Sequence, residues 1–263
     1  MRILFIGDIV AKLGRKAVSE ILPSLVEEEK VDLVIANVEN LSHGKGATPQ
    51  AIDEIRGYGV DIMTSGNHIW FREETYPLLE NDPTIIRPAN YPGDVAGFGF
   101  TIATVSGKEK VLVVNLLGRL WIPDPTEDPF RTIDEIIADQ CAKEKFAAII
   151  VDFHAEATSE KMAMGWYLDG RVTLVAGTHT HIPTSDTWIL PKGTAYVSDV
   201  GMTGAQHSVL GVDPETIIKA HKYPYPQKFE WVETGPKIFS SVFVETDKKG
   251  MAKSIKRIDK ILE

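Results

Sequence analysis

Five apolar segments of this sequence lead directly into side chains that can bind a metal ion, and this pattern constrains the fold more than any other feature. Each segment is rich in β-branched and aliphatic residues, which is typical of a buried strand. The carboxyl ends of parallel strands lie at one edge of a sheet, where α/β proteins bind their ligands. The pattern therefore predicts an α/β fold whose strand ends meet at one site. The five segments are residues 5–8, 36–40, 65–68, 151–154 and 177–181.

Seven side chains in these segments are candidate metal ligands. They are Asp8, Glu39, Asn40, Asn67, His154, His179 and His181. Taken singly, each has an ordinary explanation: Asp8 could cap a turn, and His154 could be a hydrogen-bonded structural histidine. Taken together, they are oxygen and nitrogen ligands that suit Mn²⁺, Fe²⁺, Fe³⁺ or Zn²⁺. Seven ligands are too many for one ion with an open position, so we expect two ions about 3.5–4 Å apart, bridged by Glu39.

His179 and His181 leave two geometries open, because a single residue separates them. In an extended strand, their rings would share one face of the sheet. A sharp turn would instead let the two rings bind neighbouring ions. Both geometries are compatible with a metal site.

A centre of this kind would support the hydrolysis of a phosphate ester. A water held between two ions is acidified to a pKa of about 7, so that hydroxide is available at neutral pH without a separate base. The metals and Asn67 would stabilise the charge on the phosphate oxygens, and His68 would give a proton to the departing oxygen. We therefore expect a metal-bridging hydroxide as the nucleophile and His68 as the proton donor.

Composition excludes several classes of protein. Hydrophobic residues make up 43% of the 263 residues and no run is long enough to span a bilayer, so we expect neither a membrane protein nor a signal peptide, and a cytoplasmic location. A net charge of −9 disfavours stable binding to long nucleic acids. The single cysteine, Cys141, excludes intrachain disulfides and thiolate clusters, and is expected to be a packing residue.

Strand-like and helix-like segments alternate along residues 1–263, which we expect to form a single α/β domain. Two βα halves joined through a mid-chain hairpin indicate two sheets packed face to face, with helices outside. Pro23 predicts a kink or a break in the first helix. The predicted strands are residues 2–6, 32–38, 61–64, 100–105, 110–116, 147–153 and 172–176, with further candidates at 187–190, 195–198, 238–245 and 252–258. The predicted helices are residues 14–29, a helix from Pro49 to Gly57, and residues 73–79, 132–143 and 159–167.

Other polar and aromatic residues have plainer interpretations. The segment of residues 42–46 lacks the spacing of a phosphate-binding loop and is expected to be a flexible loop beside the site. His207 and His221 are taken as surface residues or neighbours of the site. The tryptophans Trp70, Trp121, Trp166 and Trp188 are expected in the core or in a wall, with Trp70 near enough to His68 to reach a base.

The ordered motifs resemble those of the calcineurin-like metallophosphoesterases. The matching blocks are Gly7-Asp8, Gly66-Asn67-His68, the isolated His154 and residues 177–181. Two departures narrow the resemblance: Val10 stands where that superfamily usually has a histidine, and residues 37–40 replace its bridging aspartate block. With residues 201–204, these features are similar to the YmdB-like phosphodiesterase family.

The resemblance implies a fold, a ligand set and an activity. The fold would be a four-layer α/β/β/α sandwich of two mixed sheets flanked by helices. Asp8, Glu39, Asn40 and His181 would hold one ion, and Glu39, Asn67, His154 and His179 would hold the other. His68 would be the catalytic proton donor. The implied substrates are small phosphodiesters, 2′,3′- and 3′,5′-cyclic nucleotides among them, and the implied metals are iron or manganese.

Two other functions stay open at this point. One is a phosphomonoesterase or nucleotidase with the same metals, for which more basic side chains would be expected near the pocket. The other is a metal- and nucleotide-binding regulatory protein with slow turnover. The sequence leaves a homo-oligomer open as well.

Overall fold

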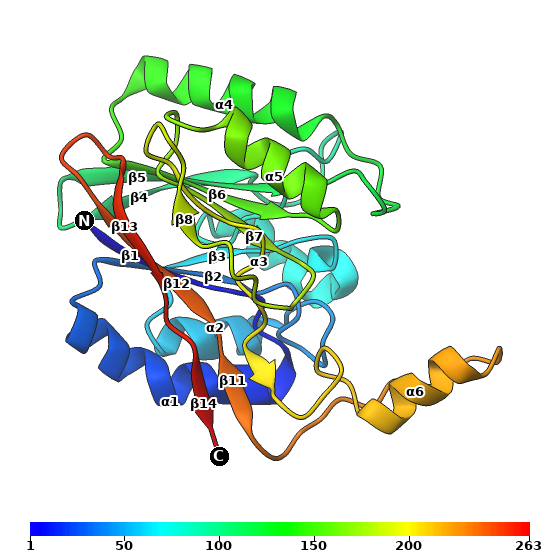
Figure 1. Ribbon diagram of the computed structural model, residues 1–263. Helices are drawn as coiled ribbons and strands as arrows, with labels where there is room; N and C mark the ends of the chain where they lie inside the picture. Colours follow the sequence, from blue (N-terminus) through cyan, green and yellow to red (C-terminus); the bar gives the residue numbers. More distant parts are fainter.

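Two mixed β-sheets lie face to face at the centre of the structure, and helices cover their outer faces (Figure 1). This computed structural model describes all residues, 1–263. The first sheet has the strand order β13-β12-β1-β2-β3. In it β1, β2 and β3 are parallel, β12 is antiparallel to β1, and β13 is antiparallel to β12. Its strands are β1 (Arg2–Ile6), β2 (Leu33–Asn37), β3 (Ile62–Thr64), β12 (Ser241–Thr246) and β13 (Ala252–Arg257).

The second sheet has the strand order β4-β5-β6-β7-β9-β8. Its four central strands are parallel, and the edge strands β4 and β8 are antiparallel to their neighbours. The expected mid-chain hairpin is β4 with β5. The strands are β4 (Phe100–Val105), β5 (Glu109–Leu117), β6 (Ala148–His154), β7 (Leu174–Thr178), β8 (Trp188–Ile189) and β9 (Ala195–Val197).

The helices form the outer layers. In Figure 1, α1 and α2 lie below the first sheet, and α4 and α5 lie above the second. Side-chain oxygens of Thr48 and Asp128 accept hydrogen bonds from the first turns of α2 and α4, and a proline follows each cap, which explains where these helices begin. The helices are α1 (Ala11–Glu29), α2 (Pro49–Gly57), α3 (Tyr76–Asn81), α4 (Pro129–Lys143), α5 (Thr158–Tyr167) and α6 (Pro214–Lys222), with short 3₁₀ turns at Ile69–Phe71 and Glu73–Thr75.

Three apolar clusters fill the spaces between the layers. The first joins β1 and β2 to α1 and α2, for example through Leu4, Leu22 and Ile52. The third joins the second sheet to its helices, as in the packing of Phe153 and Met164. The middle cluster contains residues of both sheets, so the inner sheet faces pack on one another. The expected four-layer α/β fold is therefore confirmed.

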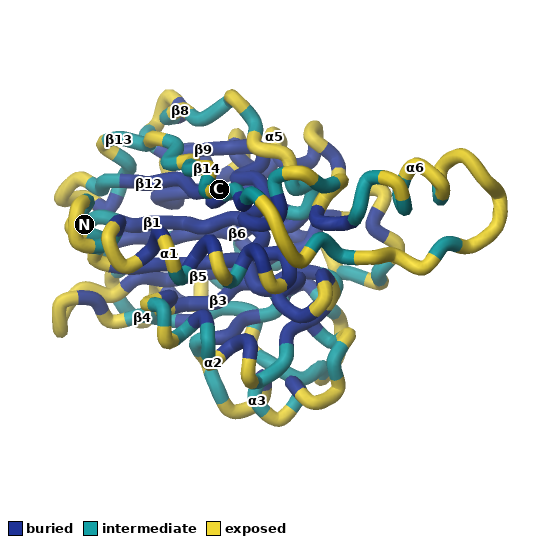
Figure 2. Tube along the Cα trace, turned by 90° about the horizontal axis from the view of Figure 1, so that it is seen from below, coloured by how far each residue is buried: buried dark blue, intermediate teal, exposed yellow.

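A segment of residues 206–236, which we call the arm, extends away from these layers (Figures 1 and 2). It contains α6, none of whose residues is buried. The two ends of the arm lie together, because Gln206 N donates to the Pro236 carbonyl oxygen at 2.9 Å. Beside these ends, β10 (Gly204–Ala205), β11 (Lys237–Phe239) and β14 (Lys260–Leu262) form a small antiparallel sheet.

Several local expectations were wrong. The first helix begins at Ala11 and contains Pro23, so the break considered there does not occur, whereas a kink at Pro23 stays a prediction. The single strand expected at residues 238–245 is two strands, β11 and β12, and α6 was not expected. Cys141 is exposed rather than packed. Trp121, Trp166 and Trp188 are also exposed, although Trp70 packs against the first core cluster. None of the helices is both long enough and apolar enough to cross a membrane.

Candidate metal centre

Six of the seven candidate ligands contact one another where the parallel strands of both sheets end, and Asn67 lies at the end of a neighbouring strand. Asp8 follows β1, Glu39 and Asn40 follow β2, and Asn67 follows β3. From the second sheet, His154 is the last residue of β6, and His179 comes directly after β7. The site therefore lies at the edge shared by the two sheets, as the strand-end pattern predicts.

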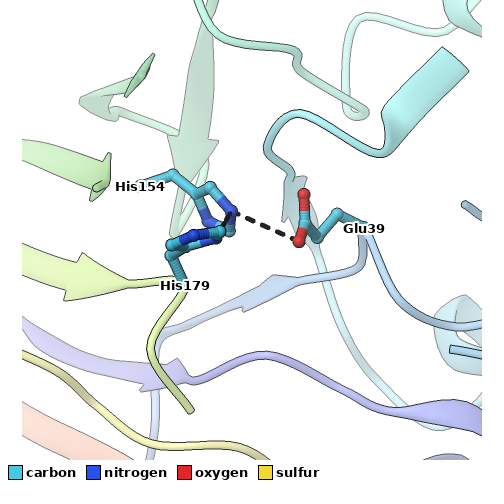
Figure 3. Close-up of side chains that lie close together, drawn as sticks. All are labelled: Glu39, His154 and His179. Carbon is cyan, nitrogen blue, oxygen red and sulfur yellow. Dashed lines mark hydrogen bonds and ion pairs between the residues drawn. The ribbon is translucent and has the colours of Figure 1, made fainter. Parts of the chain in front are cut away.

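Glu39, His154 and His179 form the tightest part of the cluster (Figure 3). One potential ligand atom from each lies within 4.8 Å of the others. His154 Nε2 is 3.2 Å from Glu39 Oε1 and 3.0 Å from His179 Nδ1. A carboxylate and two imidazoles facing one another at these distances are a suitable donor set for a transition-metal ion.

Asp8, Asn40 and His181 lie next to this group, and Asp8 contacts His154 and His179 as well as His181. Asp8 Oδ1 is 3.8 Å from His154 Nδ1 and 3.9 Å from His181 Nε2. Asn40 Nδ2 is 3.0 Å from Glu39 Oε1 and 3.2 Å from His181 Nε2. Glu39 Oε1 thus contacts both Asn40 and His154, one candidate ligand from each of the two sets that the resemblance implies.

Three polar atoms in this cluster are buried without a hydrogen-bond partner: Asp8 Oδ1, Asn67 Oδ1 and His181 Nδ1. Buried polar atoms in proteins are almost always paired, because leaving one unpaired costs free energy. All three are atoms that ligate metals. The residues therefore fit a bound cation, which would satisfy Asp8 Oδ1 or Asn67 Oδ1 where it reached them, while His181 faces Asp8 with its other nitrogen, Nε2.

The pKa shifts of residues in the cluster also favour a bound cation. Burial, which is the largest effect, raises the pKa of Asp8 to about 8, and the charges of Asp199 and Glu39 add to it against the opposing charge of His154. Burial lowers the pKa of His179 to about 3 and that of His181 to about 4, so both imidazoles are neutral and keep a lone pair. A positive ion would stabilise the ionised form of Asp8 in this setting.

Glu39 and His154 form a charged pair. Burial opposes the ionisation of Glu39, but the charges and hydrogen bonds of His154 and His68 outweigh it and hold the pKa of Glu39 well below its usual range. Burial likewise opposes protonation of His154, whereas the Glu39 carboxylate, with Asp8 and Asp152, raises the pKa of His154 to about 9. The negative charges around His154 would hold a metal cation in the same way as they hold this proton.

A layer of polar residues behind His154 fixes its orientation. The Thr178 hydroxyl donates to Asp152 Oδ1 at 2.6 Å and lies 2.9 Å from His154 Nδ1. Since the hydroxyl has one proton, which Asp152 receives, it accepts from Nδ1–H. Nε2 is then the nitrogen directed at Glu39 and His179. Metal-binding histidines are held by this kind of contact on their other nitrogen.

His179 and His181 lie in a sharp turn rather than in a strand. Both have positive φ angles, +93° and +66°, which are rare for residues other than glycine. Asp199 holds the turn between them: its Oδ2 accepts from Thr180 N at 3.0 Å and forms a buried ion pair with Lys161 Nζ at 2.8 Å. The second of the two geometries open from the sequence is thus the one present.

His68 is fixed on one nitrogen and free on the other. Asn40 donates through Nδ2 to the Glu39 carboxylate, so its oxygen faces His68, and His68 Nδ1 lies 2.9 Å from that oxygen. An amide oxygen only accepts, hence Nδ1 carries a proton and donates it there. His68 Nε2 is left to exchange a proton in the cavity that His68 lines. The Asn40 oxygen is engaged by His68 in this arrangement, so a ligand role for Asn40 stays a prediction.

The site opens into a cavity of about 380 Å³ with two chemically distinct sides. Glu39, Asn40, His68, His179 and His181 line one side. The other side consists mostly of apolar residues of the arm. They are Val209, Leu210, Val212, Ile217, Phe229 and Trp231.

Some residues of the site were not identified from the sequence. Glu156 lines the cavity and its Oε2 lies 3.1 Å from His179 Nε2. Asp199 and Lys161 come from segments that carry no recognisable motif. Trp231 and His221 line the cavity, whereas Trp70 does not. Only Glu156 had a signal in the sequence, as a carboxylate two residues after His154.

Known proteins similar to this chain share most of its length. The sequence model of the YmdB-like proteins matches residues 4–258. The 2′,3′-cyclic-nucleotide 2′-phosphodiesterase of Bacillus subtilis strain 168 is 45% identical over 262 residues, 100% of this chain and 97% of that protein. A putative phosphatase/phosphodiesterase of Mycoplasma genitalium is 35% identical over 269 residues, 100% of this chain and 94% of that protein.

Two solved structures have the same fold. A hypothetical protein from Thermus thermophilus superposes with a TM-score of 0.92 at 42% identity, covering 99% of both chains. A novel phosphatase from Mycoplasma pneumoniae superposes with a TM-score of 0.92 at 35% identity, covering 99% of this chain and 93% of that one.

Proposed function

Because this chain belongs to the YmdB-like protein family, we propose that it is a metal-dependent phosphodiesterase whose substrates are cyclic nucleotides, the 2′,3′-cyclic ones first. The observation that carries the proposal is the cluster of strand-end ligands, three of whose buried atoms lack a partner, beside a cavity that His68 lines. The similarity to a relative named for 2′,3′-cyclic nucleotides supports that substrate preference; 3′,5′-cyclic nucleotides are the second candidates.

The proposed metal centre holds two ions, iron or manganese. Asp8, Glu39, Asn40 and His181 would hold one, and Glu39, Asn67, His154 and His179 the other. The contacts of Glu39 with both groups support its role as the bridge. When bound, such ions supply Lewis acidity that activates water and neutralises the charge of a phosphate.

His68 would protonate the departing oxygen of the diester. Its Nδ1–H is held by Asn40, and its backbone N–H donates to Glu39 Oε2 at 3.1 Å, so the ring is oriented from two sides. The proton would leave from Nε2, which faces no protein partner. Asn67 would bind a phosphate oxygen through its amide nitrogen, with its buried, unpartnered oxygen left for a metal ion.

The lining of the cavity favours a diester over a monoester. It includes one lysine, Lys45, and no arginine. A dianionic phosphomonoester would call for more positive side chains than a monoanionic diester does. The nucleotidase alternative is therefore less well supported.

The test combines metal analysis with turnover. Protein purified without added metal is analysed for metals and assayed with 2′,3′- and 3′,5′-cyclic AMP, a chromogenic diester and the matching monoester. We expect about two ions per chain and faster hydrolysis of diesters. A Glu39→Ala variant should lose most of the metal, whereas Glu135→Ala, an exposed glutamate on α4, should keep it. Retention of two ions by Glu39→Ala would refute the bridge, and faster hydrolysis of the monoester would refute the diesterase.

A further inference from the structure

We propose that the arm forms a nucleoside subsite, in which Phe229, Trp231 and Ile217 receive the base of the substrate while its phosphate lies at the candidate metal centre. This inference rests on the proposed function and deepens it, because it names the residues that select nucleotides among phosphodiesters. None of these residues belongs to the set of candidate ligands.

The lining of the cavity has a polar part and an apolar part, which correspond to the phosphate and the base of a cyclic nucleotide. Its polar half carries Glu39, His68 and the two histidines of the sharp turn, where an anionic phosphate would lie with the metals. Its other half is apolar and aromatic, as a flat base requires. The volume of about 380 Å³ falls within the range of about 300–1,000 Å³ that is usual for small-molecule sites.

Trp231 is held in a fixed position. A Cβ atom on Gly44 would lie 2.0 Å from Trp231 Cη2, and one on Gly211 would lie 3.0 Å from its Cζ3, so both glycines allow the indole to pack closely. The backbone of Trp231 also pairs with Val212 in an antiparallel bridge at the base of the arm. An aromatic ring fixed in this way needs little reorganisation to stack on a base.

Phe229 and α6 complete the apolar side. The Phe229 side chain is 48% exposed although it faces a cavity, so part of its ring is uncovered. On α6, Ile217 and His221 are four residues apart and therefore share the helix face that lines the cavity. Ile217 adds an apolar surface for contact with a ring or a ribose, and His221 is the one residue of this helix face that can form a hydrogen bond.

This chemistry predicts weak discrimination between bases. Stacking on aromatic rings tolerates every base, since each has a π face. Among the arm residues that line the cavity, only His221 and the indole N–H of Trp231 can form side-chain hydrogen bonds. We therefore expect purine and pyrimidine nucleotides to be accepted, with purines bound better because their rings are larger.

The experiment compares a nucleotide with a diester that lacks a base. The metal-loaded protein and its Phe229→Ala variant are assayed with 2′,3′-cyclic AMP and with glycerol 1,2-cyclic phosphate. The expected result is a loss of about tenfold in kcat/KM for the nucleotide, mainly through KM, with the glycerol diester within twofold. Tyr225→Ala is the matched control, because Tyr225 is an aromatic residue of the arm, 58% exposed, that does not line the cavity.

Binding gives a second readout that does not need turnover. The affinity for adenosine 3′-monophosphate, measured by calorimetry, should fall about tenfold in Phe229→Ala and in Trp231→Ala, while the affinity for inorganic phosphate stays unchanged. Trp231→Phe should restore most of the nucleotide affinity, which separates loss of stacking from a disturbed arm. Equal losses for the two cyclic diesters, or unchanged nucleotide affinity in Phe229→Ala, would overturn the subsite. If the unaltered protein hydrolyses neither diester yet these affinities change as expected, the proposed function fails and the subsite stands.

Discussion

At the scale of single residues, Asn40 links the candidate metal centre to the proposed proton donor. Its amide nitrogen lies against Glu39 and His181, and its oxygen accepts from His68. A displacement of the candidate ligands Glu39 or His181 would therefore move Asn40, and with it the ring of His68. Because His68 is not itself a candidate ligand, its contribution to catalysis can be measured with the metal content determined alongside.

Replacement of His68 by alanine is expected to lower kcat for diester hydrolysis by about 10²–10⁴-fold, the usual contribution of a general acid. The metal content should not change, since His68 is not among the proposed ligands. His207→Ala is the control, as His207 is an exposed histidine outside the cavity. Unchanged hydrolysis by metal-loaded His68→Ala would show that another group protonates the leaving oxygen.

Gly66 is needed for a close approach of the chain to the site. A Cβ atom on Gly66 would lie 2.3 Å from both Glu39 Oε2 and His154 Nε2. We expect Gly66→Ala to lose most of the bound metal, as measured by elemental analysis, because these two side chains must move apart. Gly57→Ala, where a Cβ meets nothing within 4 Å, should keep its metal and change stability by no more than about 1 kcal/mol. Full metal content in Gly66→Ala would mean that the site tolerates this displacement.

The grouping of candidate ligands at the strand ends could be predicted from the sequence, because strand ends and ligand-capable residues both leave local signals, whereas metal binding by them stays a prediction. Tertiary contacts leave none. Asp199 acts on residues almost twenty positions away through Thr180, and Trp231 reaches the cavity from the arm. Tryptophan and cysteine are often buried, yet Trp121 is 80% exposed, since hydrophobic residues also cover much of a protein surface.

At the scale of elements, the turn after β7 depends on an ion pair from two other segments. Lys161 of α5 and Asp199, which follows β9, are both almost completely buried, and Asp199 also accepts from Gly201 N at 2.7 Å. Together they hold His179 and His181 in their unusual backbone conformation. Removing one partner would leave the other charge buried alone.

Asp199→Ala should lower the free energy of unfolding by about 3–5 kcal/mol, measured by chemical denaturation. The control is Asp139→Ala, whose pair with Lys143 on α4 is exposed, and which should cost at most about 1 kcal/mol. Comparable losses in the two variants would indicate that the buried pair does not hold the turn.

The prediction of helices and strands succeeded where the apolar pattern was long. It failed where contacts with distant parts of the chain determine the structure. The alternating β and α segments gave both sheets and their covering helices. Ser240 interrupts the apolar run of residues 238–245, so that β11 pairs with β14 and β12 with β1, which no local pattern reveals. α6 does carry local start signals, since Asp213 caps it and Pro214 is its first residue, and these were overlooked.

At the scale of the whole molecule, the inner faces of the two sheets share one apolar cluster. It contains Phe5 and Val242 of the first sheet and Val113 and Ile150 of the second. We propose that residues 1–263 form a single domain, because neither sheet could expose this inner face to water without a large loss of hydrophobic stabilisation.

Unfolding by urea is therefore expected to follow one transition, with coincident curves from far-ultraviolet circular dichroism and tryptophan fluorescence. Trp70 reports on the first half of the chain, whereas Trp166 and Trp188 report on the second. Two separated transitions would show that the halves unfold independently and would contradict a single domain.

The arm leaves and rejoins the small sheet at adjacent points, where Gln206 and Pro236 are hydrogen-bonded. Segments whose ends meet in this way are the ones that proteins exchange most readily. The candidate ligands all come from strand ends outside the arm. A different segment could therefore replace residues 206–236, and so change one part of the cavity lining, without changing the candidate ligands at the strand ends.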